Sequence, residues 1–168
     1  AKLEQHKLEM NKKEVPLSPM IEDLIEKFTI KTEKTIHFTT DLKTEKVYAD
    51  EEFLKEAISN LIDNAIKYSK ESVKINISSS SDANHDIINI YDNGIGIPQK
   101  DQKKIFEKFE RASAIKQTRK GGPSGFGLGL NYVYQVMEAH EGRVYINSIE
   151  GEFSEFSLLI PKIIESYD

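Results

Sequence analysis

The stretch that decides the fold is residues 50–69, DEEFLKEAISNLIDNAIKYS. Its hydrophobic residues recur every three or four positions, which predicts an amphipathic helix with one wide apolar face that packs against a sheet or other helices. That face consists of Leu54, Ala57, Ile58, Leu61, Ile62, Ala65 and Ile66. Asp50 is a suitable N-cap residue, and Glu51 and Glu52 favour the positive end of the helix dipole.

A polar row runs along the opposite side of this helix, at Glu56, Asn60, Asn64 and Lys67. Such spacing stacks the four side chains on one face. Asparagine is a poor helix former, so two of them in mid-helix cost some helix propensity. The row is either a solvated surface or a ligand site, in which asparagine oxygens would bind a divalent ion and the lysine a phosphate. The helix alone leaves both interpretations open.

Composition sets bounds on the rest of the chain. A length of 168 residues fits one compact domain, and the net charge of −5 argues against nucleic acid as a partner. With no cysteine there can be no disulfide and no thiolate metal site. No apolar run approaches the roughly 18 residues of a membrane span. The chain starts inside a helical pattern, so we expect a fragment of a longer protein.

Working outward, the first 14 residues have the pattern of a helix end, and Pro16 and Pro19 interrupt it. Ser18 is expected to cap a new helix that fades near Lys34. Strands are expected at residues 36–40, 73–79, 86–91, 143–149 and 153–160, with Val47 and Tyr48 pairing weakly with the first of them. A further helix is expected at residues 126–139, with Gly142 in the stop position.

Three further clusters bear on chemistry. The run Asp92-Asn93-Gly94-Ile95-Gly96-Ile97 ends a strand, and its glycines would let the backbone approach a flat ring, although a plain turn has the same composition. Residues 125–130, GFGLGL, open a helix and could hold an anion on free amides, or could simply pack closely. Residues 105–111, IFEKFER, form either an amphipathic patch with a basic end or a small satellite core.

Taken in order, these motifs resemble the catalytic and ATP-binding domain of a two-component sensor histidine kinase, within the ATPase superfamily of gyrase, Hsp90 and MutL. The four boxes are EAISNLIDNAIKYS, DNGIGI, IFEKFER and GFGLGL, and the likeness runs from about Ile21 to Pro161. It implies a two-layer α/β sandwich of the Bergerat type. We expect a mixed, mostly antiparallel sheet of about five strands with three helices on one face.

The resemblance also implies a role for individual residues, with ATP and Mg²⁺ as cofactors. Asn64 would bind Mg²⁺ and Asn60 would lie beside it, while Lys67 and, from the lid, Arg111 would meet the phosphates. Asp92 would accept the amine of adenine and would repel the carbonyl oxygen of guanine. Further nucleotide contacts are implied for Tyr68, Gly94, Gly96, Ile97, Gly125, Gly127, Leu128 and Gly129.

Two departures from the family pattern affect these expectations. No histidine has the surroundings of the phosphoacceptor, so the chain should bind ATP without phosphorylating itself. The last glycine box is degenerate, because Phe153 stands where the family has glycine. A gyrase-type ATPase would need a glutamate where Asn60 stands. Two further interpretations are a small stand-alone serine kinase and a nucleotide-binding pseudo-kinase.

Domain organisation and partners also follow from the resemblance. Residues 1–17 would be the end of the phosphoacceptor helical hairpin and its linker, and residues 18–168 the ATP-binding domain with a lid at 98–124. The partners would be the phosphoacceptor domain of the parent protein and a response-regulator receiver domain. The fragment is expected to be a monomeric cytoplasmic domain, and its parent a homodimeric membrane-bound sensor.

Overall fold

The computed structural model describes residues 9–103 and 126–163, with side chains from residue 129 onward in the last helix. Five strands form the main sheet in the order β2-β4-β5-β7-β6. Their bounds are Thr35–Leu42 for β2, Ser72–Ser81 for β4, His85–Asp92 for β5, Arg143–Ile149 for β6 and Phe153–Pro161 for β7. β2 and β4 run parallel and the other pairs run antiparallel, so the predicted mixed sheet is confirmed.

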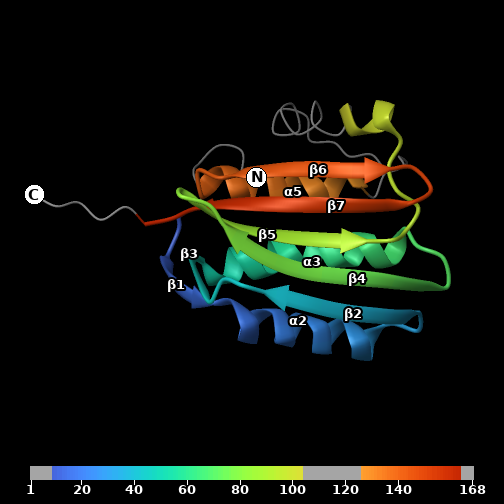
Figure 1. Ribbon diagram of the computed structural model, residues 1–168, viewed down its shortest axis with the longest axis horizontal. Helices are drawn as coiled ribbons and strands as arrows, with labels where there is room; N and C mark the ends of the chain where they lie inside the picture. The colour runs from blue at the N-terminus through green and yellow to red at the C-terminus, as the bar shows by residue number, and fades with distance from the viewer. Residues whose placement is uncertain (1–8, 104–125, 164–168) are drawn as a thin grey trace, which may run out of the picture.

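Three helices cover one face of this sheet, as predicted (Figure 1). They are α2 (Leu17–Lys31), α3 (Glu51–Lys67) and α5 (Phe126–Ala139). The whole predicted apolar face of α3 is buried, and Asp50 caps the helix by accepting a hydrogen bond from the Phe53 N–H at 3.0 Å. α5 lies beside α3 and contacts the Asn60 and Asn64 part of the polar row.

Two predictions about the N-terminal part are wrong. Lys12–Pro16 forms a strand, β1, rather than the end of a helix, and it pairs antiparallel with β3 (Lys46–Asp50). The reason is the cross-strand pair Val15 and Val47, which are both buried in the core. Residues 47 and 48 consequently pair with β1 and not with β2.

Helix ends differ from the predictions in two places. Pro16 occupies the N-cap position of α2, so Ser18 lies within the first turn and does not cap the helix. At the end of α5, Glu141 adopts the left-handed conformation with φ 62°, and the Gly142 N–H donates to the Met137 carbonyl at 2.8 Å. Gly142 is required for a different reason, because a Cβ there would clash with the Leu159 carbonyl.

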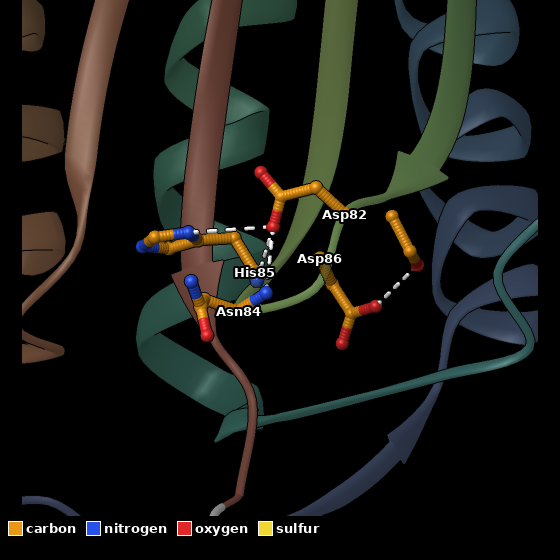
Figure 2. A network of polar contacts seen from close by, with 5 residues as sticks. Asp82, Asn84, His85 and Asp86 are labelled. Atoms are coloured by element: carbon orange, nitrogen blue, oxygen red, sulfur yellow. Dashed lines mark hydrogen bonds and ion pairs between the residues drawn. The ribbon is translucent and has the colours of Figure 1, made fainter.

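The turn between β4 and β5 is held by its own side chains (Figure 2). Asp82 accepts hydrogen bonds from the backbone N–H groups of Asn84 and His85, at 2.8 and 2.7 Å. These bonds lower the pKa of the Asp82 carboxyl below its usual value. Asp86, the next residue on β5, accepts from the Ser81 hydroxyl at 2.7 Å, which ties the two strands together where they leave the turn.

Candidate nucleotide site

Asn64 is the buried member of the polar row on α3. Its exposed fraction is 7%, and among the residues that the structure describes its Nδ2 has no hydrogen-bond partner. A Cβ placed on Gly129 of α5 would lie 3.7 Å from this Nδ2 and 3.9 Å from the Cβ of Asn60. At Gly129, α5 therefore packs close to both asparagines, at a distance where a Cβ would make ordinary van der Waals contact. A buried amide without a partner costs free energy, so its position favours a polar ligand between these helices.

Lys67, at the C-terminal end of the row, has an exposed side chain. The Lys67 side chain is 58% exposed, and its Nζ lies 3.5 Å from an oxygen of Asp63, one turn earlier. Tyr68, the next residue, is the C-cap of α3 and lines the same pocket as Asn64. The structure therefore brings Tyr68 to the site and leaves Lys67 at its solvent side.

Asp92 lies at the end of β5 with its carboxyl turned toward the helices. It is 7% exposed and accepts a hydrogen bond from the Gly94 N–H at 2.8 Å. Burial raises the pKa of this carboxyl from 3.8 to about 6, and the Gly94 bond opposes the change in part. A buried acceptor at a strand end can recognise one donor of a flat ligand.

The glycines after Asp92 are needed for close approach. A Cβ on Gly94 would lie 2.7 Å from the Tyr68 carbonyl oxygen. Gly96 has φ +73°, and a Cβ there would also clash with the Ile149 carbonyl. Ile97 is buried and donates its N–H to the Ser148 hydroxyl at 2.8 Å. The loop is thereby held against both the end of α3 and the β6–β7 hairpin.

One pocket joins these features across α3, the loop and β7. Its lining residues are Leu61, Asn64, Ala65, Tyr68, Asp92, Ile95, Gly96, Ser154 and Phe156. The apolar members can cover a ring, and Asn64 and Asp92 supply polar groups at separate points. Asn60, Gly94 and Ile97 support this pocket from behind or beside it and are not part of the lining.

Ser154 is a site residue that sequence reasoning missed. It lies on β7 directly opposite Asp92 in the strand register, is buried, and lines the pocket. Its hydroxyl lies 3.0 Å from that of Ser148. The signal was available in the alternation of residues 153–160, which places Ser154 on the face that the helices cover.

Several predicted site residues lie outside the described part of the chain. Arg111, Gly125 and the patch at residues 105–111 are among these, as is most of the predicted lid. Gly127 and Leu128 belong to the first turn of α5, and only their backbone is described.

None of the described histidines contributes to the site. His140 follows a helix end, where a cation would suit the dipole, but it is buried and donates from Nδ1 to the Val136 carbonyl at 2.8 Å. Its Nε2 accepts the Asp50 N–H at 3.0 Å, which requires the neutral ring. Burial lowers its pKa. Within the described residues no group of His, Asp and Glu side chains is arranged to hold a metal ion.

Comparisons with known proteins show the family of this chain. The sequence model of the histidine kinase-, DNA gyrase B- and HSP90-like ATPases matches residues 49–164. The chain is 33% identical over 158 residues to the adaptive-response sensory kinase SasA of Crocosphaera subtropica, covering 92% of this chain and 40% of that protein. It is 29% identical over 172 residues to the sensor histidine kinase WalK of Bacillus subtilis, covering 100% and 28%. The chain thus spans less than half the length of these relatives.

Solved structures show the same architecture. The catalytic domain of histidine kinase ThkA superposes with a TM-score of 0.75 at 28% identity, covering 91% of this chain and 99% of that one. A structure of ThkA in complex with the response regulator protein TrrA gives a TM-score of 0.70 at 25% identity, covering 92% and 42%. Within the described residues, no helix is long and apolar enough to span a membrane.

Proposed function

This chain belongs to the family of histidine kinase-, DNA gyrase B- and HSP90-like ATPases, and from that premise we propose that it is the ATP-binding catalytic domain of a sensor histidine kinase. It transfers the γ-phosphoryl group of ATP to a histidine on a separate helical domain, for relay to a response regulator. The observation that carries the proposal is the joint presence of Asn64 and Asp92 in one pocket. Asn64 is a buried amide whose Nδ2 is unpaired, and Asp92 is a buried carboxyl; these groups suit the phosphates and the base of a nucleotide.

The base end of the site selects adenine. The second oxygen of Asp92 accepts the exocyclic amine, while Gly94 and Gly96 keep side chains away from the ring. Guanine carries a carbonyl oxygen at that position, which a carboxylate repels. Ser154 adds a hydroxyl beside Asp92 on the neighbouring strand.

The phosphate end is formed by the facing parts of α3 and α5. Asn64 would hold Mg²⁺ through its side-chain oxygen with Asn60 beside it. Its unpartnered Nδ2 is a donor and would suit a phosphate oxygen. When bound, Mg²⁺ neutralises phosphate charge in the transition state of phosphoryl transfer. Gly127, Leu128 and Gly129 present backbone amides at the start of α5. The resemblance assigns Gly125 to the same cradle, although it lies outside the described residues.

Two cations complete the phosphate end. Lys67 reaches the phosphates by exchanging its exposed contact with Asp63, which costs little because surface ion pairs are weak. The resemblance assigns the second cation to Arg111, which lies outside the described residues. Catalysis then consists of positioning and charge neutralisation and needs no covalent intermediate on the protein.

The partners proposed for this domain are the phosphoacceptor helical hairpin of its parent and a receiver domain. The support for a receiver is that ThkA, whose catalytic domain has the same architecture, is seen in complex with its response regulator. We propose that the parent is a homodimeric membrane sensor with this domain on the cytoplasmic side.

Transfer in trans is the test of this function. The chain is mixed with the phosphoacceptor hairpin of its parent and γ-labelled ATP, and labelled hairpin is quantified on a gel. Label on the hairpin that is acid-labile and absent for Asn64→Ala supports the proposal. Hydrolysis of ATP without labelled hairpin would instead indicate an ATPase of the gyrase type.

A further inference from the structure

The end of α3 that touches the glycine loop is held by a lysine from another segment. Lys34 lies between α2 and β2, and its Nζ donates to the Ile66 carbonyl at 2.5 Å, the Ser69 carbonyl at 3.0 Å and the Ser69 hydroxyl at 3.2 Å. All three donors of the ammonium group are therefore engaged at one helix end. The last carbonyls of a helix lack intrahelical partners and carry its negative dipole, so a half-buried cation stabilises them.

This contact fixes the turn that leaves α3. The Ser69 hydroxyl also donates to the Ile66 carbonyl at 2.7 Å, so that carbonyl accepts two hydrogen bonds. The Tyr68 N–H donates to the Asn64 carbonyl at 3.0 Å. With its neighbours on both sides held, the Tyr68 carbonyl has a defined direction.

The Tyr68 carbonyl in turn supports the loop that follows Asp92. It accepts the Ile95 N–H at 3.1 Å, and it is the atom that a Cβ on Gly94 would meet at 2.7 Å. Gly94 itself donates to the Asp92 carboxyl. A change in the position of the α3 end would therefore move Gly94 and Ile95 beside the carboxyl that faces the base.

We propose that Lys34 is a positioning residue for the adenine end of the nucleotide pocket. It does not line the pocket, and it acts through the C-terminal turn of α3 on the Tyr68 carbonyl and the Ile95 amide. The identity of the ligand rests on the proposed function, whereas the mechanical link from Lys34 to Ile95 does not.

Hydrogen exchange of the Ile95 amide in the nucleotide-free protein tests the link. In Lys34→Met we expect this amide to exchange about tenfold faster, because the bond that protects it loses its support. Lys31→Met removes the same charge from the exposed last turn of α2 and should leave the exchange unchanged. Lys34→Arg should restore most of the protection, because a guanidinium can also donate to carbonyls.

The Ile97 amide is the internal reference, because it donates to Ser148 and not to Tyr68. Equal acceleration at Ile95 and Ile97, or no acceleration at Ile95, would overturn the proposal. If Lys34→Met does not fold, Ser69→Ala removes one of the three Lys34 contacts together with the bond from Ser69 to the Ile66 carbonyl. It should accelerate Ile95 exchange by about threefold relative to Ile97. An unchanged ratio in that variant would equally overturn it.

Ligand affinity separates this link from the proposed function. Lys34→Met should weaken AMP, ADP and a non-hydrolysable ATP analogue by the same factor, because the displaced groups face the base. A loss that grows with the number of phosphates, or no loss for any of the three, would contradict a role at the adenine end. If the unmodified protein binds no adenine nucleotide, the proposed function fails while the exchange result still decides the role of Lys34.

Discussion

At the scale of single residues, Asp92 is a buried carboxyl whose charge opposes stability. Its carboxyl has a pKa near 6 in the folded protein and 3.8 as the ordinary value. Because the folded state binds the proton more tightly, this group makes the protein less stable as the pH rises from about 4 to 6. Above that range the full penalty, of the order of 3 kcal/mol, is present.

Asp92→Asn should therefore stabilise the nucleotide-free domain. At pH 8 we expect a gain of up to about 3 kcal/mol in the free energy of unfolding, because the buried charge is removed while the bond from Gly94 is kept. Urea unfolding at pH 8, 6 and 4 measures it, and the gain should shrink toward pH 4. Asp41→Asn on the exposed side of β2 is the control. A gain that does not depend on pH would show that Asp92 is not the titrating group.

Asn64 is a second residue at which stability and the proposed nucleotide binding are opposed. Asn64→Leu has the same branched shape, with larger methyl groups, and removes the unpartnered Nδ2. We therefore expect about 1–2 kcal/mol of added stability together with complete loss of Mg²⁺-dependent nucleotide binding. Thermal unfolding and nucleotide titration of the same sample measure both effects. Reduced stability in this variant would mean that the amide has a partner in solution.

The sequence predicted part of this site and missed part for physical reasons. Asn64 and Asp92 stood out because a mid-helix asparagine and a strand-end carboxylate are unfavourable without a ligand. Ser154 did not stand out, because serine is unremarkable in a strand and its position opposite Asp92 depends on strand register. The role of Lys34 could not be predicted, because its contacts lie 32 and 35 residues away in the sequence.

At the scale of elements, His140 joins the start of α3 to the end of α5. Its Nε2 accepts the Asp50 N–H and its Nδ1 donates to the Val136 carbonyl. The carboxyl of Asp50 in turn accepts the Asn11 N–H at 2.8 Å. Because burial lowers the pKa of His140, its contribution to stability is complete above the unfolded value of 6.5 and is lost as the pH falls below it.

His140→Gln tests this junction, because a glutamine amide can donate and accept like the neutral ring but does not titrate. The variant should be less stable than the unmodified protein at pH 7.5, by about 1–2 kcal/mol, because the glutamine amide cannot match the geometry of both hydrogen bonds of the imidazole. The difference should narrow at pH 5.5. Chemical denaturation at the two pH values measures it, and an equal difference at both would argue against a neutral buried histidine.

Elements with strong periodicity were predicted well, as α3, α5 and β4 to β7 show. β1 was not, because its charged residues at 12–14 fit a helix pattern and only Val15 enters the core. The partner of β3 was also missed. Pairing between strands depends on long-range contacts, and residues 46–50 are adjacent in sequence to β2 but pair with β1.

At the scale of the whole molecule, β1 makes the incoming chain part of the domain. Val15 and Leu17 are both fully buried, although the sequence placed the domain boundary after residue 17. A chain starting at residue 18 should be at least about 3 kcal/mol less stable than one starting at residue 9, because two apolar side chains leave the core. Denaturant unfolding of the two chains compares them. Equal stability would mean that residues 9–17 are a linker and do not stabilise the domain.

The central claim is that one pocket recognises adenine through Asp92 and Mg²⁺ through Asn64. The most direct test is calorimetric titration with a non-hydrolysable ATP analogue, with and without Mg²⁺, and with a GTP analogue alongside. The account predicts Mg²⁺-dependent binding of the ATP analogue, rejection of the GTP analogue, and loss of ATP binding in Asp92→Asn, whose new N–H₂ faces the adenine amine. Unchanged ATP binding in Asp92→Asn, or equal affinity for both nucleotides, would contradict it.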